Sequence, residues 1–172
     1  MLTNYSISQL CIGLASLSLG ALGFAFIAEY VLMIAPCELC IYQRYIYFIL
    51  IIISTITICF RLAFIQRFLL FCSTIVVFVG CLIAFYHVGV EQQIITEPSS
   101  CASTINKSSS LTLEEMKNQI YNNITHCSEV SFKFLGISMA GWNGILLLIV
   151  FIILTKYLYA TSLMNNKKKH EK

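Results

Sequence analysis

Long apolar runs alternate with shorter polar segments along this chain. Four runs each reach the roughly 20 residues that a helix needs to cross a bilayer, and they cover about residues 7–35, 42–60, 68–86 and 142–163. Pro36 ends the first run, because the residue before a proline is pushed out of the helical region. The run has no basic segment before it and no small-residue cleavage site, so we expect a retained helix rather than a signal peptide.

The polar segments differ in charge, and this difference predicts how the chain is oriented. The link at 61–67 carries two arginines and the tail at 164–172 carries four lysines. An excess of Lys and Arg marks cytoplasmic segments. In the loops at 36–41 and 87–141 acidic residues outnumber lysines. We therefore expect both termini on the cytoplasmic side and both loops on the opposite side.

The loop at 87–141 contains a predicted helix of its own. Its segment Thr112-Leu-Glu-Glu115 fits a capping box, which satisfies backbone donors at a helix start. Apolar residues then recur at helical spacing, at Leu113, Met116, Ile120 and Ile124. This pattern predicts a short amphipathic helix lying against the membrane surface. The expected fold is an all-α membrane protein, a bundle of four transmembrane helices with this surface helix in the second loop.

Composition indicates a lipid environment. Hydrophobic residues make up 58% of the 172 residues and charged residues only 11%, and the mean hydropathy is +0.82. Soluble domains carry about 25% charged residues, so this chain has too few polar side chains to cover a globule in water. We expect one membrane domain over the whole length. The net charge of +3 gives no indication of nucleic-acid binding.

The eight cysteines fall into two groups by their surroundings. One group lies inside the apolar runs, where a thiol behaves as a small buried hydrophobe: Cys11, Cys59, Cys72 and Cys81. The other group lies in or beside polar segments, all on the side expected to be non-cytoplasmic: Cys37, Cys40, Cys101 and Cys127. In a bacterial cell that side is the oxidising periplasm. The expected location is therefore the bacterial inner membrane.

Cys37-Glu-Leu-Cys40 is the sharpest local motif. Two cysteines at this spacing can close a small, reactive disulfide, and the dipole at a helix start favours an anionic sulfur. Arg44 lies one turn beyond Cys40 on the same helix face, where its charge can stabilise a thiolate. A stapling disulfide and a metal site are the alternatives. Because zinc would need further ligands, and the loops offer only His87 and His126, we favour a redox pair without a metal.

Cys101 and Cys127 form the second candidate pair, in the long polar loop. Taken alone, they favour a stabilising loop disulfide, which contributes about 3 kcal/mol in the chain-entropy picture. Beside a CxxC motif on the same membrane side, an exchange of disulfides between the two pairs explains them better. The serines around Cys101 would let the loop carry one pair to the other, or present Cys101 to a soluble partner.

Three segments together resemble the signature segments of the DsbB family, the quinone-dependent thiol oxidases of bacterial inner membranes. They are Pro36-Cys-Glu-Leu-Cys-Ile-Tyr-Gln-Arg44, Phe85-Tyr-His-Val-Gly-Val-Glu91 and Phe134-Leu-Gly-Ile-Ser-Met-Ala-Gly-Trp-Asn143. The resemblance covers nearly the whole chain. It implies a four-helix bundle that reoxidises a periplasmic thioredoxin-fold dithiol oxidase, DsbA, and passes two electrons to a membrane quinone, either ubiquinone or menaquinone.

The same resemblance implies a role for each cysteine of the second group. The reduced partner would attack the Cys101–Cys127 disulfide at Cys101 and form a mixed disulfide. The freed Cys127 would attack the Cys37–Cys40 disulfide at Cys37. Cys40 would then leave as a thiolate beside the quinone.

Arg44 and His87 are the residues that the resemblance implies for cofactor binding. Arg44 would stabilise the thiolate and the reduced quinone, although it could also be an interfacial anchor. His87 would hydrogen-bond a quinone carbonyl or pass a proton, although an interfacial histidine needs no ligand. Gln43 is neutral where some relatives carry an acid. Glu29, an ionisable residue at membrane depth, is a further functional candidate.

Two other functions remain open from sequence. A non-enzymatic tetraspanning scaffold with disulfide-stapled loops would share the hydropathy and the cysteine placement, but would not need Arg44. A carrier that brings reducing power to periplasmic thiols would need cysteines within reach of the cytosol, and the apolar-run cysteines show no paired spacing near the cytoplasmic segments, although Cys59 lies close to one.

Overall fold

The computed structural model describes residues 7–34, 36–60, 62–96 and 133–170. Its elements are α1 (Ile7–Tyr30), α2 (Glu38–Cys59), α3 (Ala63–Glu91), β1 (Lys133–Phe134), β2 (Ile137–Ser138) and α6 (Met139–His170). All four of these helices are long and apolar enough to cross a membrane, which confirms the expected all-α membrane fold. The surface helix predicted from Thr112 lies outside the described residues.

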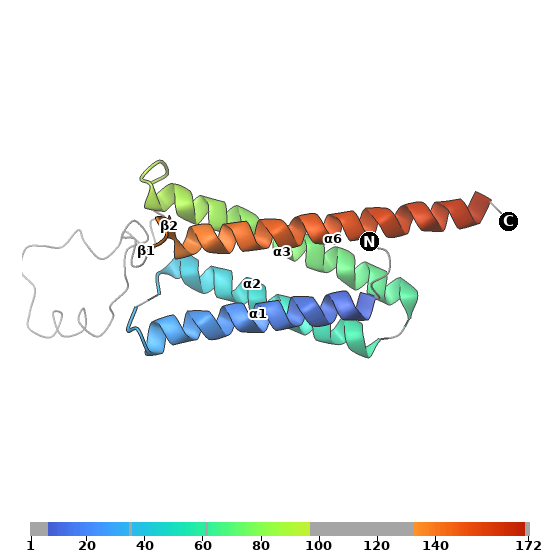
Figure 1. The fold of residues 1–172 in the computed structure, drawn as a ribbon, viewed down its shortest axis with the longest axis horizontal. Helices are drawn as coiled ribbons and strands as arrows, with labels where there is room; N and C mark the ends of the chain where they lie inside the picture. The colour runs from blue at the N-terminus through green and yellow to red at the C-terminus, as the bar shows by residue number, and fades with distance from the viewer. Residues whose placement is uncertain (1–6, 35, 61, 97–132, 171–172) are drawn as a thin grey trace, which may run out of the picture.

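The helices run antiparallel to their neighbours in sequence (Figure 1). α1 packs against α2, α2 against α3, and α3 against α6. The start of α2, the end of α3 and the small antiparallel β1–β2 hairpin meet at one end of the bundle, on the left of Figure 1. The connection between α2 and α3 lies at the other end, and α6 continues past it. The CxxC motif and the last turn of α3 thus share one end.

The connection between α1 and α2 is longer than the apolar run suggested. α1 ends at Tyr30, before the predicted end at residue 35, and α2 already begins at Glu38, before the predicted start at residue 42. Met33 has a φ of 53°, a left-handed conformation that no α-helix continues through. The chain therefore leaves the helix well before Pro36, although the residues in between are apolar.

α3 and α6 are longer than the predicted apolar runs. α3 extends beyond 68–86 at both ends and α6 beyond 142–163. Hydropathy marks the part of a helix that lies in lipid, whereas backbone hydrogen bonding continues into the polar flanks. His87 and Glu91 therefore belong to α3, and not to the loop that was expected to begin at residue 87.

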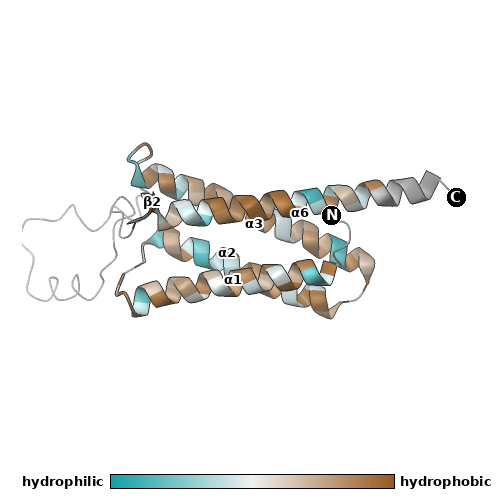
Figure 2. Cartoon of the chain, viewed as in Figure 1, coloured by the Kyte–Doolittle hydropathy of each residue, from teal (hydrophilic) through white to brown (hydrophobic). Residues whose placement is uncertain are grey.

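Apolar side chains cover the outside of the bundle as well as its inside. The core contains residues from all four helices, among them Leu22, Leu50, Leu70 and Leu154. Large hydrophobic side chains are nevertheless exposed along every helix, and Figure 2 shows hydrophobic colouring along much of α3 and α6. A water-soluble protein rarely exposes so much contiguous apolar surface. The chain is a multi-pass membrane protein.

The helices approach closely around Gly80 of α3. A Cβ atom at this position would lie 2.9 Å from Cγ2 of Ile46 and 3.1 Å from Cδ1 of Leu147. These two residues belong to α2 and α6, so three helices meet where the chain has no side chain. Small residues at such points are the usual means by which membrane helices pack.

Candidate redox site at the start of α2

The CxxC motif forms the first turn of α2. Cys37 is the N-cap residue, with an extended backbone (φ −79°, ψ 167°), and its sulfur accepts a hydrogen bond from the backbone N–H of Cys40 at 3.4 Å. Pro36 precedes it and supports this extended entry into the helix. The sulfur therefore satisfies one of the backbone donors that a helix start leaves free.

The two sulfur atoms of the motif lie in direct contact. Cys37 Sγ is 3.2 Å from Cys40 Sγ and its S–H points toward it. Cys37 is buried, whereas Cys40 is partly exposed. A small side-chain rotation would bring the sulfurs to the roughly 2.05 Å of a disulfide bond. The geometry can therefore serve both the dithiol and the disulfide.

His87 reaches this pair from the last turns of α3. Its Nε2 atom lies 3.4 Å from Cys37 Sγ, and its Nδ1 atom lies 3.3 Å from the amide nitrogen of Gln43 on α2. An amide N–H that donates to Nδ1 leaves the ring proton on Nε2. Glu91, one turn later on α3, has a carboxylate oxygen 3.7 Å from the same Nε2. Gln43 thus directs the N–H of His87 toward Cys37 and Glu91.

Contact with Cys40 makes Cys37 the proton-holding member of the pair. The hydrogen bond to Cys40 and burial together raise the pKa of Cys37 to about 12, while the hydrogen bond from His87 lowers it. A proton that stays on Cys37 and points at Cys40 stabilises negative charge on the Cys40 sulfur. The anionic sulfur of the reduced pair is therefore expected at Cys40, as the sequence suggested.

Arg44 faces a different neighbour, α1. Its guanidinium is paired with the carboxylate of Glu29, donates to the backbone oxygen of Ala25 at 3.3 Å, and lies over the ring of Phe26 at 5.2 Å from the centroid. The side chains of Arg44 and Glu29 are 16% and 23% exposed. Arg44 is therefore fixed by tertiary contacts, rather than being a free interfacial anchor.

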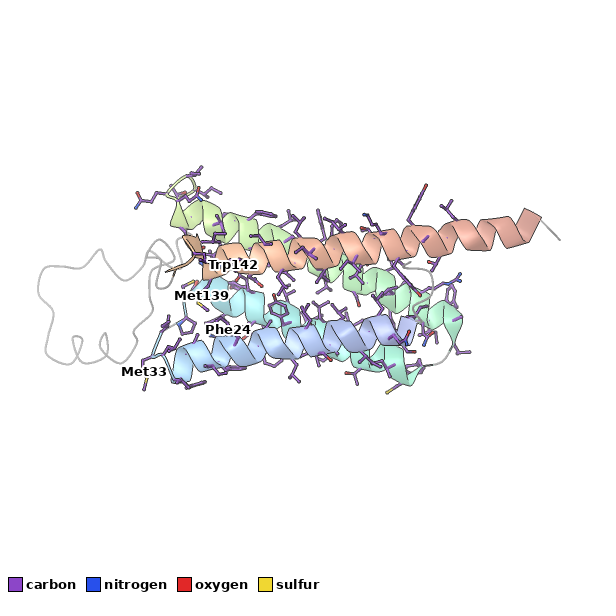
Figure 3. All side chains as sticks on the ribbon, viewed as in Figure 1. Phe24, Met33, Met139 and Trp142 are labelled. Carbon is purple, nitrogen blue, oxygen red and sulfur yellow. The ribbon has the colours of Figure 1, made fainter. Side chains whose placement is uncertain are left out.

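The structure brings together only some of the residues singled out from sequence. His87, Cys37 and Cys40 form one cluster at the α2–α3 contact, near the end of the bundle where Met33 and Met139 are labelled in Figure 3. Arg44 lies at the α1–α2 contact with Glu29. The two remaining predicted site residues, Cys101 and Cys127, lie outside the described residues.

Two polar contacts were not found from sequence. Gln43 was set aside because it does not titrate, yet it is buried and holds His87. Tyr47, one turn deeper in α2, donates to the side-chain oxygen of Asn143 on α6. The amide nitrogen of Asn143 is buried without a partner among the described residues. A polar residue inside an apolar run is the signal that could have identified these positions.

Comparison with known proteins identifies the family of the chain. The sequence profile described as "Disulfide bond formation protein DsbB" matches residues 8–156. The chain belongs to the DsbB family. DsbB proteins are membrane oxidoreductases of disulfide formation, and the matched region contains both predicted cysteine pairs, Arg44 and His87.

A relative in Rickettsia prowazekii (strain Madrid E) is similar to this chain in sequence. It is 33% identical over 147 residues, which cover 85% of this chain and 84% of the relative. Its name, "Uncharacterized protein RP370", assigns it no activity. The similarity therefore extends over most of both chains, and it adds no substrate or partner.

Proposed function

We propose that this DsbB-family protein reoxidises a periplasmic DsbA-like dithiol oxidase and passes two electrons to a membrane quinone, and so sustains protein disulfide formation. The observation that carries the proposal is the Cys37–Cys40 pair at the start of α2, with its sulfurs 3.2 Å apart and Arg44 fixed one turn beyond. A structural staple would need neither a cation on the next turn nor a histidine against its sulfur.

The proposed reaction is a relay of two disulfides. The reduced partner attacks Cys101, becomes oxidised, and leaves Cys101 and Cys127 as thiols. Cys127 then attacks Cys37, and Cys40 leaves as a thiolate. Cys101 next attacks Cys127, which re-forms the Cys101–Cys127 disulfide and releases Cys37 as a thiol. The Cys37–Cys40 dithiol then returns to the disulfide by giving up the two electrons and two protons that left the partner.

A strong electron acceptor is required for this relay to run forward. A DsbA-type disulfide has a reduction potential of about −120 mV, and for two electrons each 30 mV is about 1.4 kcal/mol. Most other protein disulfides have a lower reduction potential, so another cysteine pair is a poor final acceptor of the electrons. A bound quinone would supply the acceptor of two electrons and two protons.

Arg44, one helical turn beyond Cys40, offers donors that fit the head group of a quinone. Arg44 carries several N–H donors for a carbonyl oxygen, and its contacts with Glu29 and Phe26 hold the guanidinium in one orientation. The surrounding helix faces are apolar and open to lipid. In this proposal Arg44 binds the head group and stabilises the neighbouring thiolate of Cys40.

His87 acts on the other sulfur in this proposal. Its Nε2–H, directed by Gln43, stabilises Cys37 whenever that sulfur carries negative charge. Because Cys37 otherwise holds its proton strongly, this hydrogen bond favours the thiolate that must attack when the Cys37–Cys40 disulfide re-forms. In this proposal Arg44 stabilises the Cys40 thiolate and binds the quinone. His87 stabilises the Cys37 thiolate, which exchanges disulfides with Cys127.

A turnover assay tests the proposed function. Purified protein is mixed with a reduced thioredoxin-fold dithiol oxidase and a soluble quinone, and the quinone absorbance is followed. We expect turnover that Cys40→Ser abolishes. Cys59→Ser is the matched control, because this cysteine is exposed at the far end of α2. A scaffold would show no turnover, and turnover that survives Cys40→Ser would refute the assignment of the CxxC pair.

A trapping experiment tests the order of the relay. A partner variant that keeps only its attacking cysteine has no second thiol to release it, so its attack on the Cys101–Cys127 disulfide should leave a stable mixed disulfide that mass spectrometry locates at Cys101. A trapped species in which the partner is joined to Cys37 would overturn the assignment of Cys101 as the point of entry.

A further inference from the structure

The CxxC pair and His87 form a cluster with the composition of a soft metal site. Cys37 Sγ, Cys40 Sγ and a ring nitrogen of His87 all lie within 4.8 Å of one another. From sequence, zinc was set aside because it would need further ligands and the loops offered only His87 and His126. In the fold, His87 of α3 lies against Cys37, although the two are 50 positions apart in sequence.

The distances suit a tetrahedral ion. Bonds of about 2.3 Å to sulfur and about 2.0 Å to nitrogen place two sulfurs about 3.8 Å apart and a sulfur and a nitrogen about 3.5 Å apart. The observed separations are 3.2 Å between the sulfurs and 3.4 Å between Cys37 Sγ and Nε2 of His87. The sulfur–nitrogen distance already fits. The sulfurs need to part by about half an ångström, which a small rotation of partly exposed Cys40 provides.

The surroundings of His87 resemble the outer shell of a metal site. Histidine ligands usually have their second ring nitrogen held by a hydrogen bond, and Gln43 occupies Nδ1 of His87. For Nε2 to bind an ion, the ring proton must move to Nδ1, and the Gln43 amide must turn to present its oxygen. Glu91, whose carboxylate lies 3.7 Å from Nε2, is not part of the cluster of three ligands, so water would take the fourth position of the ion.

We propose that the dithiol form of this protein binds a thiophilic divalent cation of the Zn²⁺ class through Cys37, Cys40 and His87. Binding releases the two thiol protons and leaves the oxidation state of both sulfurs unchanged. The disulfide form cannot bind, because its sulfurs are joined to each other. A metal-bound pair cannot re-form its disulfide, and Cys127 can attack only the disulfide form, so the ion holds the protein in its reduced state. This inference stands whether or not the proposed turnover is found.

Cadmium titration of the full-length protein tests the site directly. The Cys101→Ser/Cys127→Ser background removes the other polar-segment thiols, and the protein is reduced and freed of reductant without oxygen. Added Cd²⁺ should give a thiolate-to-metal absorption band that saturates at one ion per chain. The disulfide form of the same protein should give no band. A band of equal size in the disulfide form would overturn the proposal.

Variants assign the three ligands. Cys37→Ser and Cys40→Ser should abolish the one-to-one band, His87→Ala should weaken Cd²⁺ binding at least tenfold, and Cys59→Ser should change nothing. Unchanged affinity in His87→Ala would refute the site. If that variant does not fold, Co²⁺ bound to the background protein provides the readout, because the band should have the intensity of two thiolates and the visible spectrum of a tetrahedral ion. An octahedral spectrum would refute the site equally.

Discussion

At the scale of single residues, the contact between the two thiols predicts an unusual pH profile. The pKa of Cys37 is raised from 9.0 to about 12, chiefly by its hydrogen bond to Cys40. Cys37 in the reduced protein should therefore be alkylated by iodoacetamide with a midpoint far above that of an ordinary thiol. Mass spectrometry across pH 7 to 12, in the Cys101→Ser/Cys127→Ser background with a chelator present, measures this midpoint. Cys40→Ala should lower it by at least about one pH unit, a tenfold change in thiolate.

The same shift sets the direction of a stability effect. Between about pH 9 and pH 12 the folded dithiol keeps a proton that the unfolded chain has lost. The stabilisation is fully present below pH 9 and is lost as the pH rises toward 12. The reduced protein should therefore lose more thermal stability over this interval than the disulfide form, which has no Cys37 thiol. Equal losses in both forms would contradict the assignment.

The Glu29–Arg44 pair predicts a coupling between two helices. Both side chains are largely buried, so removing one charge leaves the other poorly compensated. Glu29→Gln and Arg44→Gln should each lower the unfolding temperature in detergent, and the double variant should lose less than the sum. The expected coupling free energy is about 1 kcal/mol or more. Lys156→Gln, which removes an exposed charge on α6, is the control and should have little effect.

These two clusters show what sequence can and cannot predict at this scale. Cys40 lies one helical turn after Cys37, and Arg44 one turn after Cys40, so local periodicity was enough to group them. The partners of these residues lie far along the chain: Glu29 is 15 positions from Arg44, and His87 is 50 from Cys37. Spacing carries no information about such contacts, because they depend on how whole helices pack. Family resemblance suggested His87, but not that it faces Cys37.

At the scale of elements, close packing around Gly80 predicts a position-specific effect of added methyl groups. Gly80→Ala and Gly23→Ala should gain similar helix propensity, up to about 1 kcal/mol. A Cβ at Gly23 meets nothing within 4 Å, whereas one at Gly80 meets Ile46 and Leu147. Gly80→Ala should therefore be less stable than Gly23→Ala by about 1–3 kcal/mol, measured by thermal unfolding in detergent. Equal stability would mean that the three helices are not in close contact there.

The helix ends show where hydropathy stops being informative. The apolar runs were sufficient to predict each membrane helix, because lipid demands about 20 apolar residues. The prediction for the end of the first helix was wrong, because α1 ends at Tyr30 although apolar residues follow it. The prediction for the end of the third helix was also wrong, because α3 continues past His87 through polar residues to Glu91. Backbone conformation at a helix end depends on the turn that follows, and this information does not lie in side-chain polarity.

At the scale of the whole molecule, the basic residues near one end of the helix bundle predict its orientation in the membrane. The CxxC motif and the end of α3 share one end of the bundle, and the connection between α2 and α3 shares the other with the later part of α6. Basic residues concentrate in that connection and in the C-terminal tail. The positive-inside rule predicts that this second end is cytoplasmic. Cys37 and Cys40 should then face the periplasm, where a thioredoxin-fold partner could reach them.

Reporter fusions measure this orientation in living bacteria. Green fluorescent protein folds only in the cytoplasm, and alkaline phosphatase is active only in the periplasm. Green fluorescent protein fused to the C-terminus of the full chain should therefore be fluorescent. Alkaline phosphatase fused after Ile95, beyond the end of α3, should be active. Replacing the four tail lysines by glutamine should weaken the bias, because Lys and Arg near a membrane helix set its orientation. If both reporters gave the opposite result, the CxxC pair would face the reducing cytosol, and a carrier of reducing power would replace the oxidase as the better function.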